Sequence, residues 1–382
     1  MASACQLQRR ATAEAEAGVA FDATGPVRRE PQDYRQITAS ASHSGRACVI
    51  KRPLGRQPLE LMRIGTRSSA MAIAQTDEVA AQLRAAWPDL APEVVRFTPQ
   101  GDRDQVSKLQ RHGGKGGAFV SEIRDALRAG GLDAAMHSLK DMPGDEEAPG
   151  LVIAAMLKRE PACDALVLRP GLTLARVQEL KAAHLKIGTN SVRRAAFLRR
   201  LYPQAEIIHF RGAADTRIRK LDEGAMQKLP DGREVGPADA LVVAQAGLIR
   251  VGLAERATYL FSVDEMLPAV GQGVVAVECP LKAWDLRLRL AAIDHLETRR
   301  CAEAEREVLW VLNGHCNSPI AGHGTIAGDQ LHLRAAVISE DGSKVIETRQ
   351  SGAADRPREI GRAAGLDLLA KGAAAIIEAT RL

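Results

Sequence analysis

The run from His137 to Asp141 brings an imidazole, a hydroxyl, an ammonium group and a carboxylate together directly after an apolar stretch. Pro143 then stops the predicted strand. Charged side chains at the mouth of a parallel strand lie where open α/β folds bind their ligands. Asp141 is therefore the candidate catalytic residue, with Ser138 and Lys140 beside it. The alternative is a solvated turn, which is the commoner role of a single Lys-Asp pair.

Arginines occupy equivalent positions after several other predicted strands. Guanidinium groups bind carboxylates through two parallel hydrogen bonds and stay charged. Each arginine alone would be interpreted as a surface residue, but together they predict one cleft that binds several carboxylates. This set consists of Arg67, Arg193, Arg194, Arg211, Arg217 and Arg250.

The turn before Arg193 and Arg194 also carries hydroxyl groups. Thr189 or Ser191 can cap the helix that follows, and the exposed N–H groups of its first turn favour an anion. Two arginines in that first turn oppose the helix dipole, a cost that a docked carboxylate would offset. A plain N-cap with solvated arginines is the alternative.

Two loops carry further candidates. The glycine-rich loop 113–117 fails the phosphate-loop spacing, because a glycine follows Lys115 where Ser or Thr is needed. We interpret it as a mobile cationic flap over an anionic ligand, with Arg111 and Lys115 as its charges. Cys316, in a late loop after a predicted helix, is either an ordinary buried thiol or a nucleophile whose pKa nearby arginines lower.

Composition limits the classes of protein to consider. The 382 residues are 46% hydrophobic and 26% charged, which is typical of a globular protein with two or three domains. Aromatic residues at 3% argue against a stacking platform for single-stranded nucleic acid. The net charge of +5 comes from arginines in ones and twos, which suits a small polyanion better than nucleic acid. No cysteine spacing predicts a metal site or a disulfide framework, and no apolar run predicts a membrane span.

Residues 1–60 differ from the rest. They are rich in Ala, Arg and Ser, with little apolar periodicity and no signal-peptide core. Their acidic residues disfavour a plastid or mitochondrial transit peptide. We expect a disordered extension, or a reading frame begun too far upstream of Met62, and a cytoplasmic location.

From Leu61 onward short predicted strands alternate with helices, which indicates an α/β fold with mainly parallel sheets. A polar, Gly- and Pro-containing stretch at 225–237 is predicted to be a surface insertion, and one closing helix is predicted over 357–380. The predicted domains are residues 61–160 with 274–291, residues 163–267, and a small α+β domain at 296–382.

Together these motifs resemble the porphobilinogen deaminase family, also called hydroxymethylbilane synthase. The resemblance extends from about residue 61 to the C-terminus, with its motifs in the family's order. The matching segments are residues 63–69, 113–119, 137–143, 188–194, 211–217 and 267–273.

The resemblance implies two lobes like those of periplasmic binding proteins, a cleft between them, and a third domain that carries Cys316. It implies a monomer that joins four porphobilinogen molecules head to tail with loss of ammonia, and then releases hydroxymethylbilane by hydrolysis. The primer would be a dipyrromethane cofactor, one per chain, held by a thioether to Cys316.

The resemblance also assigns roles to residues. Asp141 would stabilise the electron-poor pyrrole cation and assist proton transfer. The residues implied to hold the cofactor are Ser138, Lys140, Thr189, Ser191, Arg193, Arg194, Arg211 and Arg217. Those implied to hold the substrate are Arg67, Ser69, Phe119, Arg250 and Gln272.

The chain departs from the family pattern at several positions, including an extra residue at Gly117 and Ser121 in place of a lysine. His315 and Asn317 flank Cys316, Ala213 follows Arg211-Gly212, and Asn190 replaces a serine. These changes affect loop geometry and rate more than fold. Two other classes stay open: an exported binding protein for polycarboxylates, which would lack a bound chromophore, and a nucleic-acid-binding protein, whose affinity would depend on salt.

Overall fold

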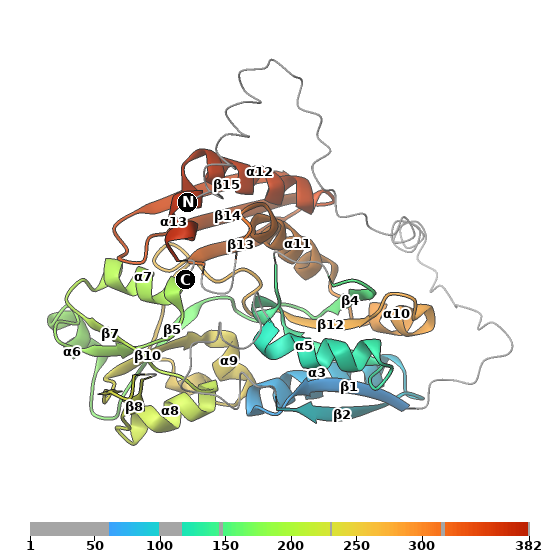
Figure 1. The fold of residues 1–382 in the computed structure, drawn as a ribbon, viewed down its shortest axis with the longest axis horizontal. Coiled ribbons are helices and arrows are strands. Elements are labelled where there is room, and N and C mark those ends of the chain that lie inside the picture. Colours follow the sequence, from blue (N-terminus) through green and yellow to red (C-terminus); the bar gives the residue numbers. More distant parts are fainter. Residues whose placement is uncertain (1–60, 99–116, 145–147, 230, 315–317, 381–382) are drawn as a thin grey trace, which may run out of the picture. The chain divides into compact units, whose positions relative to one another are not determined.

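The computed structural model describes residues 61–98, 117–144, 148–229, 231–314 and 318–380 (Figure 1). The predicted extension 1–60, the flap residues Arg111 and Lys115, and Cys316 lie outside these residues, as does the side chain of Phe119. Within the described part the strands form three main sheets and one short hairpin.

The first sheet has the strand order β2-β1-β3-β12-β4. Helices α3 and α10 pack on one face through Met62, Ile64 and Met136, and α5 packs on the other face against Ala135. This alternation of faces follows from the two-residue period of a strand. The elements are β1 (Leu61–Arg67), α3 (Ala70–Ala86), β2 (Ala91–Phe97), α5 (Gly117–Arg128), β3 (Ala134–Ser138), β4 (Leu151–Met156), β12 (Val275–Pro280) and α10 (Trp284–Ala291).

The second sheet has the order β11-β5-β10-β6-β7. Its strands are short and almost wholly apolar, so helices cover both faces. The elements are β5 (Asp164–Leu168), α6 (Leu174–Glu179), β6 (Lys186–Gly188), α7 (Val192–Leu201), β7 (Glu206–Ile208), α8 (Ala214–Asp222), β10 (Ala240–Ala244), α9 (Gln245–Arg250) and β11 (Tyr259–Leu260).

The predicted α/β class is confirmed, and each of these sheets is mixed. Strand β1 runs parallel to β2 and β3, and β6 runs parallel to β7 and β10. Strands β12 and β5 are antiparallel to both of their neighbours. They enter directly from the other sheet rather than through a crossover helix, which a parallel connection requires.

The third sheet, β13-β14-β15, is antiparallel and carries its helices on one face. The prediction of one closing helix over 357–380 is wrong, because the chain breaks at Gly372, whose φ of 91° no regular helix can hold. The predicted insertion 225–237 contains the hairpin β8–β9 (Gln227–Lys228 and Glu234–Val235). The remaining elements are α11 (Leu296–Val311), β13 (Ile320–Ala327), β14 (Gln330–Ile338), β15 (Val345–Ala353), α12 (Pro357–Ala370) and α13 (Ala373–Ala379).

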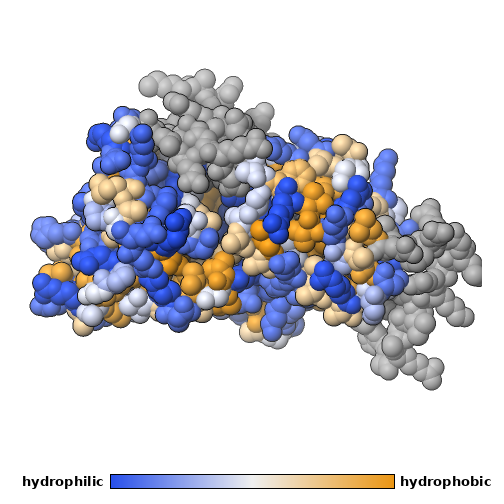
Figure 2. All heavy atoms as spheres, turned by 90° about the horizontal axis from the view of Figure 1, so that it is seen from below, coloured by the Kyte–Doolittle hydropathy of each residue, from blue (hydrophilic) through white to orange (hydrophobic). Residues whose placement is uncertain are grey.

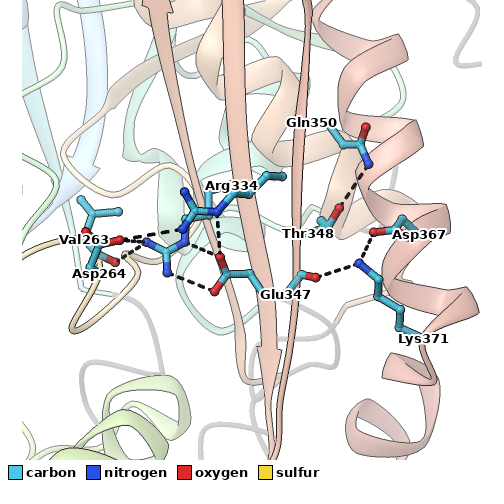
Figure 3. Close-up of polar contacts among 9 residues, drawn as sticks. Val263, Asp264, Arg334, Glu347, Thr348, Gln350, Asp367 and Lys371 are labelled. Carbon is cyan, nitrogen blue, oxygen red and sulfur yellow. Dashed lines mark hydrogen bonds and ion pairs between the residues drawn. The ribbon is translucent and has the colours of Figure 1, made fainter.

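Buried and exposed ion pairs join the third sheet and its helices to the rest. Glu305 of α11 is fully buried, pairs with Arg159, and accepts backbone N–H groups from Gly271 and Gly324. Arg334 of β14 binds Glu347 and reaches Asp264 in the loop that follows β11 (Figure 3). A buried ion pair at Glu305 and an exposed ion pair at Asp264 therefore connect the third sheet and its helices to the rest of the fold.

The surface of the described part mixes polar and apolar residues. Figure 2 shows hydrophilic side chains interspersed with hydrophobic ones on the face that it presents. The described helices include none with the length and apolar character that crossing a membrane requires.

Candidate functional site

A cavity of about 520 Å³ lies between the first and second sheets. Residues at the ends of β1, β3 and β7, and at the starts of α3 and α8, form much of its wall. Of the residues predicted for the site, those that line it are Arg67, Ser69, Ser138, Lys140, Asp141, Arg211, Arg217 and Arg250.

On the cavity wall that the first sheet forms, hydrogen bonds within the protein hold two hydroxyl groups in place. Ser69 caps α3, because its Oγ accepts the N–H of Ala72 at 3.3 Å. The Oγ of Ser138 donates to Oε1 of Gln75, one turn further along α3, at 2.8 Å. Gln75 also lines the cavity and had no role in the sequence prediction.

Lys140 and Asp141 form a single turn of 3₁₀ helix directly after β3 and are exposed to the cavity. The side chain of Lys140 is exposed to the cavity, but the cavity walls surround it and remove part of its hydration. Desolvation, and next the charge of Arg194, lower its pKa to about 8, against the opposing attraction of Asp141. Lys140 therefore loses its positive charge at a lower pH than an ordinary lysine does.

The wall from the second sheet begins where β7 meets α8. Gly212 has a φ of 128°, which favours glycine, and the N-cap residue Ala213 offers no side-chain acceptor. Beside them, Oδ1 of Asp215 and Nε of Arg217 are buried without hydrogen-bond partners in the described part. Burial, and next Arg194, lower the pKa of Arg217 to about 10. These unsatisfied groups border a cavity, which is typical of a site whose ligand completes the bonds.

Arg193, Arg194 and Gln272 have a different environment. All three are buried, and none of them lines the cavity. Asp164 receives Nη2 of Arg193 at 2.7 Å, Nε of Arg194 at 2.9 Å and Nε2 of Gln272 at 2.9 Å. Burial alone would raise the pKa of Asp164, but the two guanidinium groups outweigh it and hold the pKa at about 2.

Asp164 is the centre of this cluster, and the sequence analysis missed it. The available signal was a carboxylate that opens the otherwise apolar strand Asp164–Leu168. A buried charge in such a strand needs a partner, and Arg193 and Arg194 supply it.

Thr189 and Ser191 also act within the protein. Ser191 caps α7, as predicted, and Oγ1 of Thr189 accepts the N–H of Ser191 at 3.2 Å. Asn190 lies between them and lines the cavity, and its Oδ1 accepts the N–H of Phe210 at 2.8 Å. The asparagine that departs from the family pattern therefore ties this turn to the end of β7.

Arg250 connects the two walls. Its Nε lies 3.1 Å from Oε2 of Glu78 on α3, and its Nη2 donates to the carbonyl of Gly273 at 3.2 Å. A carboxylate ligand at Arg250 would add to these contacts or replace them.

Comparison with known proteins identifies the family. Residues 62–287 match the family model described as "Porphobilinogen deaminase, dipyromethane cofactor binding domain", and residues 299–370 match "Porphobilinogen deaminase, C-terminal domain". The chain belongs to the porphobilinogen deaminase family. It is a transferase of tetrapyrrole biosynthesis with a dipyrromethane cofactor, so these predictions are confirmed.

Relatives agree with the family models over most of the chain. Porphobilinogen deaminase from Syntrophobacter fumaroxidans is 38% identical over 318 residues, covering 83% of this chain and 97% of that protein. Porphobilinogen deaminase 2 from Streptomyces coelicolor is 38% identical over 321 residues, covering 84% and 97%.

Solved structures show weaker similarity. A putative lipoprotein from Ruminococcus gnavus has a TM-score of 0.35 at 14% identity, covering 61% of this chain and 91% of that one. The periplasmic aliphatic sulphonate binding protein of Escherichia coli has a TM-score of 0.33 at 14% identity, covering 66% and 74%.

The residues present fit the cofactor of the family. A dipyrromethane carries acetate and propionate groups on two pyrrole rings, so it needs cations and one acceptor for ring N–H groups. The cavity presents an accessible carboxylate at Asp141 and an unsatisfied guanidinium nitrogen at Arg217. Its cationic lining residues in the described part are Arg67, Lys140, Arg211, Arg217 and Arg250.

Proposed function

We propose that this cavity binds the cofactor and the growing chain of pyrrole rings, and that Asp141 is the catalytic residue. The observation that carries the proposal is that the exposed carboxylate of Asp141 shares a cavity with five cationic side chains, while the second carboxylate of the wall, Asp215, is half-buried beside Arg217. A polycarboxylate with ring N–H groups complements this pattern of charge. When bound, the cofactor supplies the nucleophilic pyrrole carbon from which the chain grows.

Asp141 would act on the ring that loses ammonia. Its carboxylate is exposed and lines the cavity, so it can accept pyrrole N–H groups and stabilise the positive charge that develops as ammonia leaves. The same carboxylate can hold a proton on its way to the leaving amine or from the attacked ring carbon.

The cationic side chains would bind and orient the acidic substituents. We assign Ser138, Lys140, Arg211 and Arg217 to the cofactor and Arg67, Ser69 and Arg250 to the incoming substrate. Arg193 and Arg194, with Thr189, Ser191 and Gln272, would act by fixing the turn that precedes α7 and by the positive field of the two guanidinium groups. Phe119, Arg111 and Lys115 keep their predicted roles in the substrate site and its flap.

The finer features of the family are part of the same proposal. They are one cofactor per chain on a thioether to Cys316, a monomeric and cytoplasmic enzyme, and porphobilinogen as the partner molecule. The three sheets with their helices support three domains at 61–160 with 274–291, at 163–267 and at 296–382.

The stoichiometry of turnover tests the function. The purified protein, supplied with porphobilinogen alone, should consume four porphobilinogen and release four ammonia for each hydroxymethylbilane formed. Binding of porphobilinogen without release of ammonia would instead indicate a binding protein built on the same cleft.

A further inference from the structure

His137 lines the cavity but has no role in the site described so far. It lies on β3 two residues after Ala135, which packs against Ile123 and Leu127 of α5. Because alternate residues of a strand share a face, His137 points to the same side of the sheet as Ala135. Only 6% of the residue is exposed.

Glu278 of β12 stands beside the imidazole. The antiparallel register places Glu278 opposite Ala135, and therefore on the face that His137 shares. Oε2 of Glu278 lies 3.5 Å from Nε2 of His137. This is an ion-pair distance, yet Nε2 has no hydrogen-bond partner in the described part of the chain.

Arg124 of α5 holds the same carboxylate from the other side. Its Nη2 lies 2.9 Å from Oε1 and its Nε lies 3.0 Å from Oε2 of Glu278, so the pair is bidentate. All three residues are buried. Burial raises the pKa of Glu278, but His137 and Arg124 outweigh this effect and hold it at about 2, so the carboxylate is charged.

We propose that His137 is a further ligand-binding residue of the cleft, for a carboxylate of the pyrrole chain, and that Glu278 and Arg124 are its positioning residues. The charges of Glu278 and Arg124 cancel, so the two residues add no net charge beside the imidazole, which can donate a ring N–H to a ligand carboxylate. A carboxylate beside an imidazole fixes the orientation of the ring. The inference rests on the proposed function, because the ligand is the chain of pyrrole rings.

The test compares two forms of the protein by imidazole NMR. One is the wild-type protein, whose intact mass shows the cofactor, and the other is Cys316→Ser, which cannot form the thioether. We expect the His137 signal, assigned through His137→Asn, to differ between the two forms. The signal of His332, which is exposed on β14 and contacts Ser351, is the internal control and should not change.

Kinetics separates a binding role from a structural one. His137→Asn should lower kcat/KM about tenfold, the loss expected for one hydrogen bond to a charged group, while His332→Asn leaves it unchanged. Arg124→Lys should keep most of the activity that Arg124→Leu loses. Adding Glu278→Gln to His137→Asn should lower kcat/KM little further, because positioning residues act only through the imidazole.

The outcomes distinguish the two proposals. An unchanged His137 signal in protein that carries the cofactor mass, together with normal kcat/KM in His137→Asn, would overturn this inference alone. A bare polypeptide mass in the wild-type protein would overturn the proposed function, and this inference with it.

Discussion

The cluster around Asp164 and the cavity wall around Arg217 are both rich in arginine, but they differ in how their charges are satisfied. Asp164 binds Arg193, Arg194 and Gln272 away from the cavity, so both guanidinium groups have a counter-charge within the protein, although Nε of Arg193 has no hydrogen-bond partner in the described part. Nε of Arg217 likewise has no hydrogen-bond partner in the described part of the chain, but Arg217 lines the cavity, where a ligand can reach it. We infer from this difference that the Asp164 cluster stabilises the fold and that the wall around Arg217 binds a polyanion.

The largest expected effect is on turnover. Asp141→Asn keeps the shape of the side chain and removes the charge that stabilises the cationic ring, so kcat should fall at least about a thousandfold. Because Asp141 is exposed to the cavity, the melting temperature of the Asp141→Asn variant should stay close to that of the wild-type protein. Steady-state assays with porphobilinogen and a thermal melt measure both. Near-normal turnover would contradict the role given to Asp141.

The second largest effect is on stability. Asp164→Asn leaves two buried guanidinium groups without their counter-charge, so the free energy of unfolding should drop by about 3 kcal/mol or more. Asp264→Asn is the matched control, because it breaks the pair of Arg334 with a carboxylate that is 82% exposed, and it should cost less than about 1 kcal/mol. Denaturant unfolding of both variants gives the comparison. Equal losses in the free energy of unfolding would show that the buried Asp164 cluster stabilises the fold no more than an exposed ion pair does.

Arg217→Gln should lower activity without lowering stability, which is the reverse of what we expect for Asp164→Asn. Removing this half-buried cation, whose buried Nε has no hydrogen-bond partner among the described residues, should leave the stability of a Cys316→Ser protein unchanged or slightly higher. In the loaded protein the same change should lower kcat/KM about tenfold, because a charge-assisted contact to the ligand is lost. A loss of stability in the unloaded protein would place Arg217 with Asp164 as a structural residue.

A smaller effect should appear in the pH profile. The pKa of Lys140 in the free protein is about 8, so its positive charge is present below that pH and is lost as the pH rises through it. In the loaded enzyme the carboxylates of the cofactor, which we assign to Lys140, stabilise this charge further, so we expect kcat/KM for porphobilinogen to fall severalfold only as the pH rises beyond about 8. Lys140→Gln should have a lower kcat/KM below pH 8 and lack this step. A step of equal size in that variant would assign it to another group.

The smallest effect concerns the N-cap of α8. Ala213→Asn supplies the acceptor that this cap lacks and should raise the free energy of unfolding by about 0.5–1 kcal/mol. Thermal or denaturant unfolding measures it, and Ala213→Gly serves as a control without an acceptor. An unchanged stability for Ala213→Asn would mean that water already satisfies these N–H groups.

Sequence analysis predicted the elements that place the site well, because their signals are local. The strand that leads into His137 and the cap at Ser191 follow from an apolar run and from the position of a hydroxyl group. It could not separate Arg193 from Arg217, since both arginines follow strands in the same way. Only the fold shows that Asp164, on a distant strand, neutralises Arg193. The break at Gly372 was missed because the apolar pattern continues across it.

We propose that this arginine-lined cleft binds a covalently attached polyanion. The most direct test is the intact mass of the purified protein beside that of Cys316→Ser, both made in a host that supplies porphobilinogen. The account predicts a surplus equal to two linked pyrrole units in the wild-type protein and a bare polypeptide mass in the variant. A bare polypeptide mass in both would contradict it.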